Sequence, residues 1–355
     1  MNQIANAPVG GYSMDALSRL LLPGRGRTRD AQEMKAEKFD ELLELADLNH
    51  VTVRALGLLA KRNDDVGERA ANARAAELAR IENAVSILER ICAGFKEAGY
   101  DVTVIKSLDH WPDLGSDLDL FTTARPEQVL ALMKEKFGAE TAERSWGDRL
   151  AGKWNFVVPG MPELIECHVG RLGQTGEQAS IAAALPARAQ RVNRGEHWFT
   201  VTGASDRLMI STLQRMYRHF FFRLCDIVDT VELCDAHGVD YDDLERSARK
   251  AGIWEGVATF MAIVSDYAEW YRGTGLGLPH GVRAAARFGG SEIFFRDSFI
   301  RVPIMPQSAS LYGLQLSGMI RKGELQNSAR LTLLPWLATA AAVGQKITGS
   351  DKGIW

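Results

Sequence analysis

The stretch "VIKSLDHWPDLGSDLDLF", residues 104–121, places two aspartates inside an apolar, strand-like run. Asp117 and Asp119 alternate with Leu118 and Leu120. Successive side chains of a strand point to opposite faces, so the two aspartates share one face and the leucines take the other. Neighbouring carboxylates repel each other, and proteins tolerate this where a divalent cation neutralises the pair. The stretch therefore predicts a metal site on one face of a buried strand.

A third carboxylate occurs in "ELIECHVG", residues 163–170, where Glu166 and His168 share one face of a second expected strand. If this strand lies beside the first, Glu166 joins Asp117 and Asp119 in one cluster. Three carboxylates can hold two Mg²⁺ or Mn²⁺ ions, one activating a hydroxyl nucleophile and one clamping a triphosphate. For His168 we consider three roles: a residue that orients the carboxylates, a phosphate contact, or a structural histidine.

Small and basic residues around the aspartate pair predict phosphate binding. Lys106 and Ser107 end the first expected strand, where a lysine charge and free backbone N–H groups can hold phosphate oxygens. Gly115 and Ser116 directly precede the pair and would let the backbone approach a ligand closely.

A second basic set lies in "RMYRHFFFRLCD", residues 215–226. In a continuous helix, Arg215, His219, Arg223 and Asp226 would form one stripe, because they follow at steps of four, four and three. Arg223 and Arg215 are candidates for reaching a triphosphate across a cleft. The alternative is a solvated helix face on which Arg223 pairs with Asp226.

The order of expected elements indicates an α+β fold with a small mixed β-sheet core. Residues 1–30 predict a flexible arm. Residues 31–204 predict a helical lead-in and the sheet core, with the pattern strand, strand, helix, strand, strand after residue 100. Residues 205–355 predict a helical C-terminal domain, whose stretch 331–347 reads as a buried or docking helix rather than a membrane contact.

These motifs, in the order "VIKS", "WPDLGS", "DLDLF" and "IECH", resemble the polymerase-beta-like nucleotidyltransferase superfamily, and most closely its uncharacterised bacterial branch. Ser107 stands where that branch usually has glycine, and Glu166 where it usually has aspartate. The resemblance implies transfer of a nucleoside monophosphate from an NTP to a hydroxyl or phosphate acceptor, with release of pyrophosphate. Asp117, Asp119 and Glu166 would be the catalytic metal ligands, and Glu166 would also assist deprotonation of the acceptor. The alternative is a non-catalytic descendant that binds a nucleotide or a partner protein.

Composition narrows the partners. The 355 residues carry a formal net charge of −3, with no basic tract, which argues against bulk nucleic acid and for a small-molecule or protein acceptor. No apolar run reaches the length of a membrane span, and the first residues lack the pattern of a secretory signal. The four cysteines have no metal-ligand spacing, so free thiols in the cytoplasm are expected.

Overall fold

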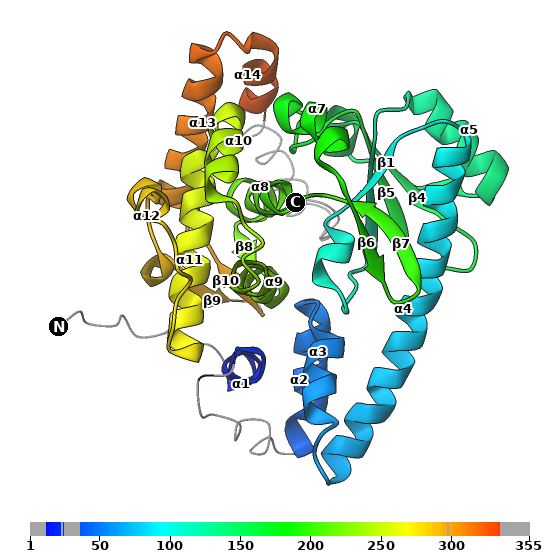
Figure 1. Cartoon of the computed structure of the whole chain (residues 1–355), viewed down its shortest axis with the longest axis vertical. Coiled ribbons are helices and arrows are strands. Elements are labelled where there is room, and N and C mark those ends of the chain that lie inside the picture. The colour runs from blue at the N-terminus through cyan, green and yellow to red at the C-terminus, as the bar shows by residue number, and fades with distance from the viewer. Residues whose placement is uncertain (1–11, 23, 25–35, 297, 334–355) are drawn as a thin grey trace, which may run out of the picture.

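The computed structural model describes residues 12–22, 24, 36–296 and 298–333, and it has the expected α+β fold. Figure 1 shows a twisted sheet with its own helices beside a larger helical part. The helical part contains helices from both ends of the described chain, because α1, α2 and α3 lie with the helices that follow residue 203.

The larger sheet is mixed, with strand order β3-β4-β5-β2-β1-β7-β6. Its central strands β1 and β2 are antiparallel, and β2 pairs with β5 in parallel. The strands predicted from the sequence are present, and the structure adds the β6–β7 hairpin, whose alternating polar residues gave only a weak strand signal. The bounds are β1 (Val102–Ile105), β2 (Asp117–Thr122), β3 (Glu140–Thr141), β4 (Lys153–Val157), β5 (Leu164–Val169), β6 (Gln190–Arg194) and β7 (His197–Val201).

Two helices, α4 (Asp65–Glu97) and α5 (Pro126–Phe137), share an apolar cluster with one face of this sheet. Leu118 and Leu120 of β2 point into the cluster and are fully buried, as the alternation predicted. The predicted apolar stripe of α4 is confirmed, since five of its six members are buried and Leu78 packs against the cluster: Leu78, Ile81, Val85, Leu88, Cys92 and Phe95.

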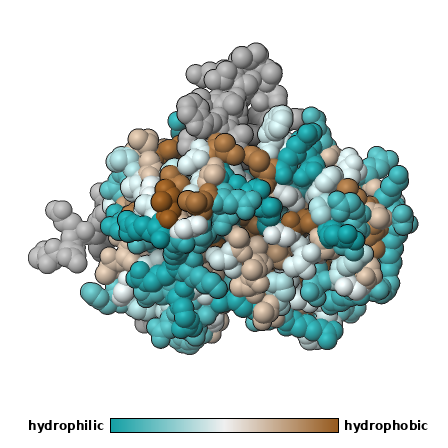
Figure 2. Space-filling view, turned by 90° about the horizontal axis from the view of Figure 1, so that it is seen from above, coloured by the Kyte–Doolittle hydropathy of each residue, from teal (hydrophilic) through white to brown (hydrophobic). Residues whose placement is uncertain are grey.

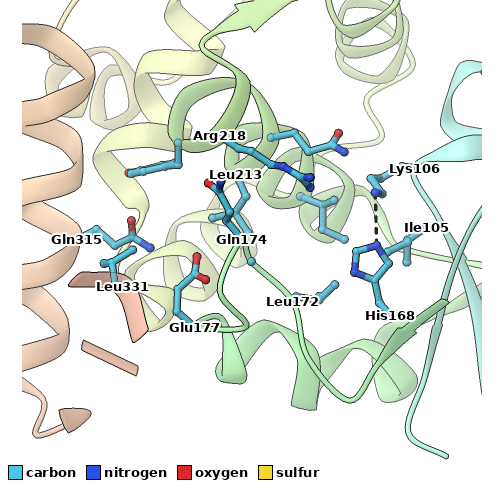
Figure 3. Close-up of a pocket in the computed structure, with 14 residues that line it drawn as sticks. Ile105, Lys106, His168, Leu172, Gln174, Glu177, Leu213, Arg218, Gln315 and Leu331 are labelled. Atoms are coloured by element: carbon cyan, nitrogen blue, oxygen red, sulfur yellow. Dashed lines mark hydrogen bonds between the residues drawn. The ribbon is translucent and has the colours of Figure 1, made fainter. Parts of the chain in front are cut away.

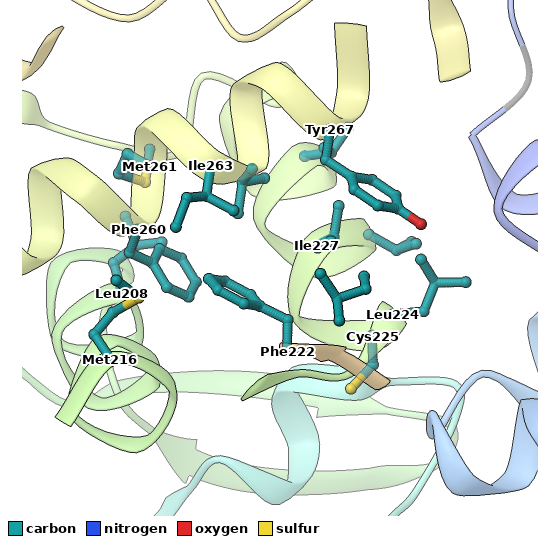
Figure 4. Close-up of a cluster of buried hydrophobic side chains, with 14 of the residues drawn as sticks. Leu208, Met216, Phe222, Leu224, Cys225, Ile227, Phe260, Met261, Ile263 and Tyr267 are labelled. Carbon is teal, nitrogen blue, oxygen red and sulfur yellow. The ribbon is translucent and has the colours of Figure 1, made fainter. Parts of the chain in front are cut away.

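The opposite face of the sheet turns toward the helical part. That part has a large apolar core in which Phe222 stacks on Phe260 with ring centroids 5.1 Å apart (Figure 4). Its helices are α1 (Tyr12–Leu21), α2 (Phe39–Leu48), α3 (Thr52–Leu59), α7 (Ala179–Arg188), α8 (Ala204–Gln214), α9 (Leu224–Asp235), α10 (Tyr241–Ala251), α11 (Trp254–Arg272), α12 (His280–Ala285), α13 (Ala309–Arg321) and α14 (Leu325–Thr332). The short helix α6 (Trp146–Ala151) precedes β4 in the sheet part.

Within the predicted arm, the described residues 12–21 differ from the prediction. Residues 12–21 form helix α1, in which Leu17 and Leu20 are buried against the helical core. The apolar spacing within "YSMDALSRLL" supplies this stripe. Packing therefore joins the N-terminal helices to the helices after residue 203, across the predicted boundary at residue 204.

The end of the described chain carries apolar side chains on its surface. Figure 2 looks down on the end of the molecule with α13 and α14, where apolar and polar residues are mixed. Ile320 and Leu325 of these helices are exposed. Most of the predicted helix over residues 331–347 lies outside the described residues. Among the helices that the structure describes, none has both the length and the apolar content to cross a membrane.

Candidate functional site

The two strands that carry the carboxylates are neighbours in the sheet, as expected. Strand β2 pairs with β5 in parallel register, and Asp119 lies directly opposite Glu166. Both side chains are on the face of the sheet that turns toward the helical part. Asp117 lies one step along the same face and is exposed. The strand pairing thus brings Glu166 beside Asp119, whereas Asp117 is not in the close group of ligand atoms, which Asp119 and Glu166 form with His168.

His168 contacts the carboxylates of both Glu166 and Asp119. Its Nε2 atom is 2.8 Å from Oε1 of Glu166 and 3.3 Å from Oδ1 of Asp119. The ring is buried, and its Nδ1 atom has no hydrogen-bond partner among the described residues. The position fits a residue that orients the two carboxylates, the first of the roles considered.

Two lysines neutralise the cluster. Lys106 forms an ion pair with Asp119, and its Nζ atom is 3.4 Å from Oε1 of Glu166. Lys153 of β4 is buried and places Nζ 2.7 Å from Oε2 of Glu166. Lys106 was predicted as a phosphate ligand. Lys153 was missed, although its position opposite His168 in the β4–β5 register puts it on the same face.

The surroundings shift the pKa values of Glu166 and Asp117 in opposite directions. Burial alone would raise the pKa of Glu166, but Lys106, Lys153 and the hydrogen bond with His168 hold it well below its usual value. At Asp117, desolvation and then repulsion from Asp119 and Glu166 raise the pKa. Glu166 is therefore ionised, whereas at Asp117 the opposing effect of Lys106 and Lys153 only partly offsets desolvation and the repulsion from Asp119 and Glu166.

The loop residues predicted to cradle phosphate lie at the same place. Ser107 Oγ accepts a hydrogen bond from the Asp119 backbone N–H at 2.7 Å and donates one to the Asp117 carbonyl at 3.2 Å. Ser116 Oγ is 3.4 Å from Oδ2 of Asp117. A Cβ atom on Gly115 would come within 2.8 Å of the His50 ring, so a residue with a side chain would displace that ring.

The basic set is not a helical stripe, and that prediction is wrong. Helix α8 ends at Gln214 and is followed by a π-helix (Arg215–His219), a left-handed residue at Phe220 and the short strand β8 (Phe221–Phe222). Helix α9 then begins after Arg223. π-helical turns occur frequently at functional sites because they redirect side chains.

The acidic residue at the start of α9 fixes this turn. Asp226 Oδ2 accepts the backbone N–H of Arg223 at 2.7 Å and lies 2.7 Å from Nε of Arg215. Asp226 therefore pairs with the buried Arg215 side chain, and not with the Arg223 side chain as the solvated-face alternative supposed.

Acidic and basic groups face a common cavity of about 240 Å³. Nine of the ten predicted site residues line it, namely Lys106, Ser107, Gly115, Ser116, Asp117, Asp119, Glu166, Arg215 and Arg223. The tenth, His168, lines an adjoining smaller cavity with Gln174, Leu213 and Gln315 (Figure 3). Lys106, Gln214 and Arg218 line both cavities.

Sequence reasoning missed several residues of the cavity wall: His50, His110, Lys153, Gln214, Arg218, His219 and Phe221. Arg218 and His219 had a signal, because they belong to the basic run between two predicted site residues. His110 had the same kind of signal, because it lies between Ser107 and Gly115, whereas His50 had none, since its approach depends on how the N-terminal helices pack. Burial and the neighbouring Arg218, Arg215 and Arg223 lower the pKa of His219 well below its usual value, so this ring is neutral.

Oxygen donors at the cluster fit a hard divalent cation. Asp119, Glu166 and His168 offer ligand atoms that all lie within 4.8 Å of one another. Carboxylate oxygens suit Mg²⁺, and Mn²⁺ also accepts imidazole nitrogen. A bound cation would further reduce the repulsion that Asp117 receives from Asp119 and Glu166, which Lys106 and Lys153 only partly offset.

Among solved structures, the chain is similar to an antigenic nucleotidyltransferase-like protein from Paracoccidioides brasiliensis. The match covers 44% of this chain and 77% of that chain, with 11% sequence identity and a TM-score of 0.32. No family model and no curated protein matches the chain.

Proposed function

We propose that this cavity binds a nucleoside triphosphate and transfers its nucleoside monophosphate to a hydroxyl or phosphate acceptor, releasing pyrophosphate. The observation that carries the proposal is the meeting of the acidic face of β2 and β5 with Arg215, Arg218 and Arg223 across one cavity. Phosphoryl transfer needs this combination, because a cation site and basic groups must together balance the charge of the triphosphate.

Each group has a role that follows from its position. Mg²⁺ or Mn²⁺, held by Asp117, Asp119 and Glu166, would supply charge neutralisation at the phosphates. Arg218 and Arg223 would bind phosphate oxygens by charge-assisted hydrogen bonds. His168 would keep Asp119 and Glu166 in their orientation.

For a hydroxyl acceptor, the oxygen attacks the α-phosphorus while the bond to the β-phosphate oxygen breaks, and pyrophosphate leaves with that oxygen. The hydroxyl proton needs a base. Glu166 was expected to take it, but its lowered pKa makes it a weak base, and Asp117 as a cation ligand would lose the repulsion that raises its pKa, so neither carboxylate is assigned this role.

One observation favours the second candidate, a non-catalytic descendant that binds nucleotide or a partner protein. Lys106 and Lys153 already pair with Asp119 and Glu166, so two of the three carboxylates are neutralised without a cation. In that protein the basic wall would still bind phosphate, while turnover would be absent.

The deciding experiment measures pyrophosphate release from a panel of NTPs with Mg²⁺ or Mn²⁺ and cell extract as the source of acceptor. We expect release by the natural chain and a loss of about 100-fold or more in Asp119→Asn, because a charge-stabilising ligand is removed. Asp242→Asn, at an exposed position of α10, is the control. Nucleotide binding without any release by the natural chain would select the non-catalytic candidate.

A further inference from the structure

A second cluster of ligand-type side chains lies at another side of the cavity, formed by His50, His110 and Cys225. Their donor atoms all lie within 4.8 Å of one another. His110 Nε2 is 3.9 Å from Cys225 Sγ. In a tetrahedral zinc site the nitrogen and sulfur ligands stand about 3.6 Å apart, as zinc–ligand bond lengths of about 2.0 and 2.3 Å require. The spacing is thus close to that of a metal site.

The three residues come from separate parts of the chain. His50 lies in the turn between α2 and α3, His110 ends the 3₁₀ helix Ser107–His110, and Cys225 is in the first turn of α9. The packing of three elements produces the cluster, which is why no cysteine–histidine spacing appears in the sequence.

Neighbouring groups hold His110 in place. The Nδ1 atom of His110 is hydrogen-bonded to Oδ2 of Asp229 at 2.5 Å, which directs Nε2 toward Cys225. A histidine that is hydrogen-bonded to a carboxylate through one nitrogen and uses the other as ligand is the common arrangement in zinc sites. Asp229 is itself fixed by Arg54, whose Nη2 is 2.6 Å from its Oδ1.

Buried Asn49 fastens the His50 turn to the start of α9. Its Oδ1 accepts the Leu224 backbone N–H at 2.9 Å, and its carbonyl accepts the Cys225 backbone N–H at 3.2 Å. The element that carries His50 is therefore tied to the one that carries Cys225. These contacts of Asn49 involve no residue of the carboxylate cluster on β2 and β5.

His50 itself has an unsatisfied ligand atom. Its Nδ1 is buried and has no hydrogen-bond partner among the described residues. The backbone takes φ 53°, a value that histidine adopts infrequently, and the ring occupies space that a Cβ on Gly115 would fill. A left-handed backbone that supports a ring whose buried Nδ1 has no hydrogen-bond partner among the described residues indicates a function beyond packing.

We propose that His50, His110 and Cys225 bind one Zn²⁺ ion, or another d-block cation of similar preference, with three protein ligands and a fourth position open to the cavity. Two imidazoles and a thiolate suit zinc and exclude Mg²⁺ as the preferred ion. His50 and His110 line the cavity, whereas Cys225 is fully buried and does not. The open position therefore faces the cavity, where it would take a water molecule or an oxygen of a bound substrate.

The buried position of Cys225 also decides against a nucleophilic role for the thiol. Cys225, His110 and Asp229 follow one another as in a thiol–imidazole–carboxylate array. A substrate in the cavity meets the two histidines first, so the sulfur is out of reach. Coordination of a small cation does not need that access.

The test is titration of the metal-free full chain with Co²⁺, which replaces zinc and reports its ligands in the absorption spectrum. We expect one equivalent to give ligand-field bands of tetrahedral intensity and a thiolate-to-cobalt charge-transfer band, both displaced by one equivalent of Zn²⁺. Absence of the charge-transfer band in the natural chain would overturn the proposal, whatever the variants do.

Variants then assign the ligands. Cys225→Ser should lose the charge-transfer band, and His50→Asn should weaken Co²⁺ binding while keeping the fold, because asparagine tolerates positive φ. Asp229→Asn should weaken it by about 10- to 100-fold. Cys234→Ser, on the same helix but outside the cluster, should change nothing. A band that survives in Cys225→Ser contradicts the assignment. The measurement uses no nucleotide, so it stands apart from the proposed transferase activity.

Discussion

Lys106 lines both cavities and balances the charge of Asp119 and Glu166. Its backbone adopts φ 61° and ψ −61°, the conformation of a γ-turn of the rare, strained kind. The turn ends β1 and carries Nζ to the carboxylate of Asp119 and to within 3.4 Å of Glu166. Strain of this kind persists where the surroundings enforce it, and it occurs often at functional sites.

At this scale we predict that Lys106→Met lowers the free energy of unfolding by about 3–5 kcal/mol at neutral pH, because a nearly buried charge pair loses one member. The loss should shrink in acid. Glu166 has a lowered pKa in the folded protein, so its stabilisation is present above its unfolded value near 4.3 and is lost as the pH falls through the folded value. Without Lys106 that dependence becomes weaker.

Urea unfolding of both proteins at neutral and acidic pH measures this effect. The control is Lys38→Met, since Lys38 pairs with Glu41 at the surface, where an ion pair contributes about 1 kcal/mol at most. Equal losses in the two variants would show that Lys106 has no special place in the charge balance of the site.

At the scale of elements, the break between α8 and α9 determines which basic side chains reach the cavity. A continuous helix would have placed Arg215 and Arg223 on one stripe and Arg218 off it. The π-helix brings Arg218 to the wall shared by both cavities, and the structure gives its side chain no carboxylate partner among the described residues. Arg218, like Arg223, is thus a cation of the cavity wall that is available to a ligand.

We therefore predict that Arg218→Ala weakens binding of a non-hydrolysable NTP analogue by about 10- to 100-fold. Loss of a hydrogen bond to a charged group costs about 1.5–3 kcal/mol, which corresponds to this range. Isothermal titration calorimetry measures it directly. Arg246→Ala, in α10 and 71% exposed, should leave the affinity unchanged. An unaffected Arg218→Ala would place the phosphates elsewhere in the cavity.

At the scale of the whole molecule, sequence patterns predicted the strands and helices that depend on residues close together in the chain. Alternation identified β2 and β5, and the three-and-four spacing identified α4. The break at Phe220 escaped, because the run 205–238 is continuously apolar on one side and holds no proline or glycine before Gly238. His50 and Lys153 escaped because only the packing of distant elements and the pairing of β4 with β5 bring them to the cavity.

A buried network connects the sheet part to both groups of helices. Nε of Arg54 in α3 lies 3.6 Å from Oδ2 of Asp113, which is in the loop between β1 and β2. Nη2 of Arg54 lies 2.6 Å from Oδ1 of Asp229 in α9. Asp113 Oδ1 also accepts the backbone N–H of Val53. One guanidinium thus serves two buried carboxylates, and the repulsion between these is only partly balanced.

This arrangement makes stability depend on pH through Asp113. Burial, and to a smaller extent repulsion from Asp229, raises the pKa of Asp113 to about 7 against the opposing effect of Arg54. With a raised pKa, the contribution of this group to folding is fully present below its unfolded value near 3.9 and is lost as the pH rises through about 7.

Asp113→Asn removes the ionisation but keeps an oxygen that can accept a hydrogen bond from the Val53 backbone N–H. We expect the free energy of unfolding of this variant, relative to the natural chain, to rise by about 2–3 kcal/mol between pH 5 and pH 8. Urea unfolding at the two pH values measures it, with the exposed Asp242→Asn as the flat reference. A difference that is the same at both pH values would mean that Asp113 is ionised throughout, and that Arg54 balances it fully.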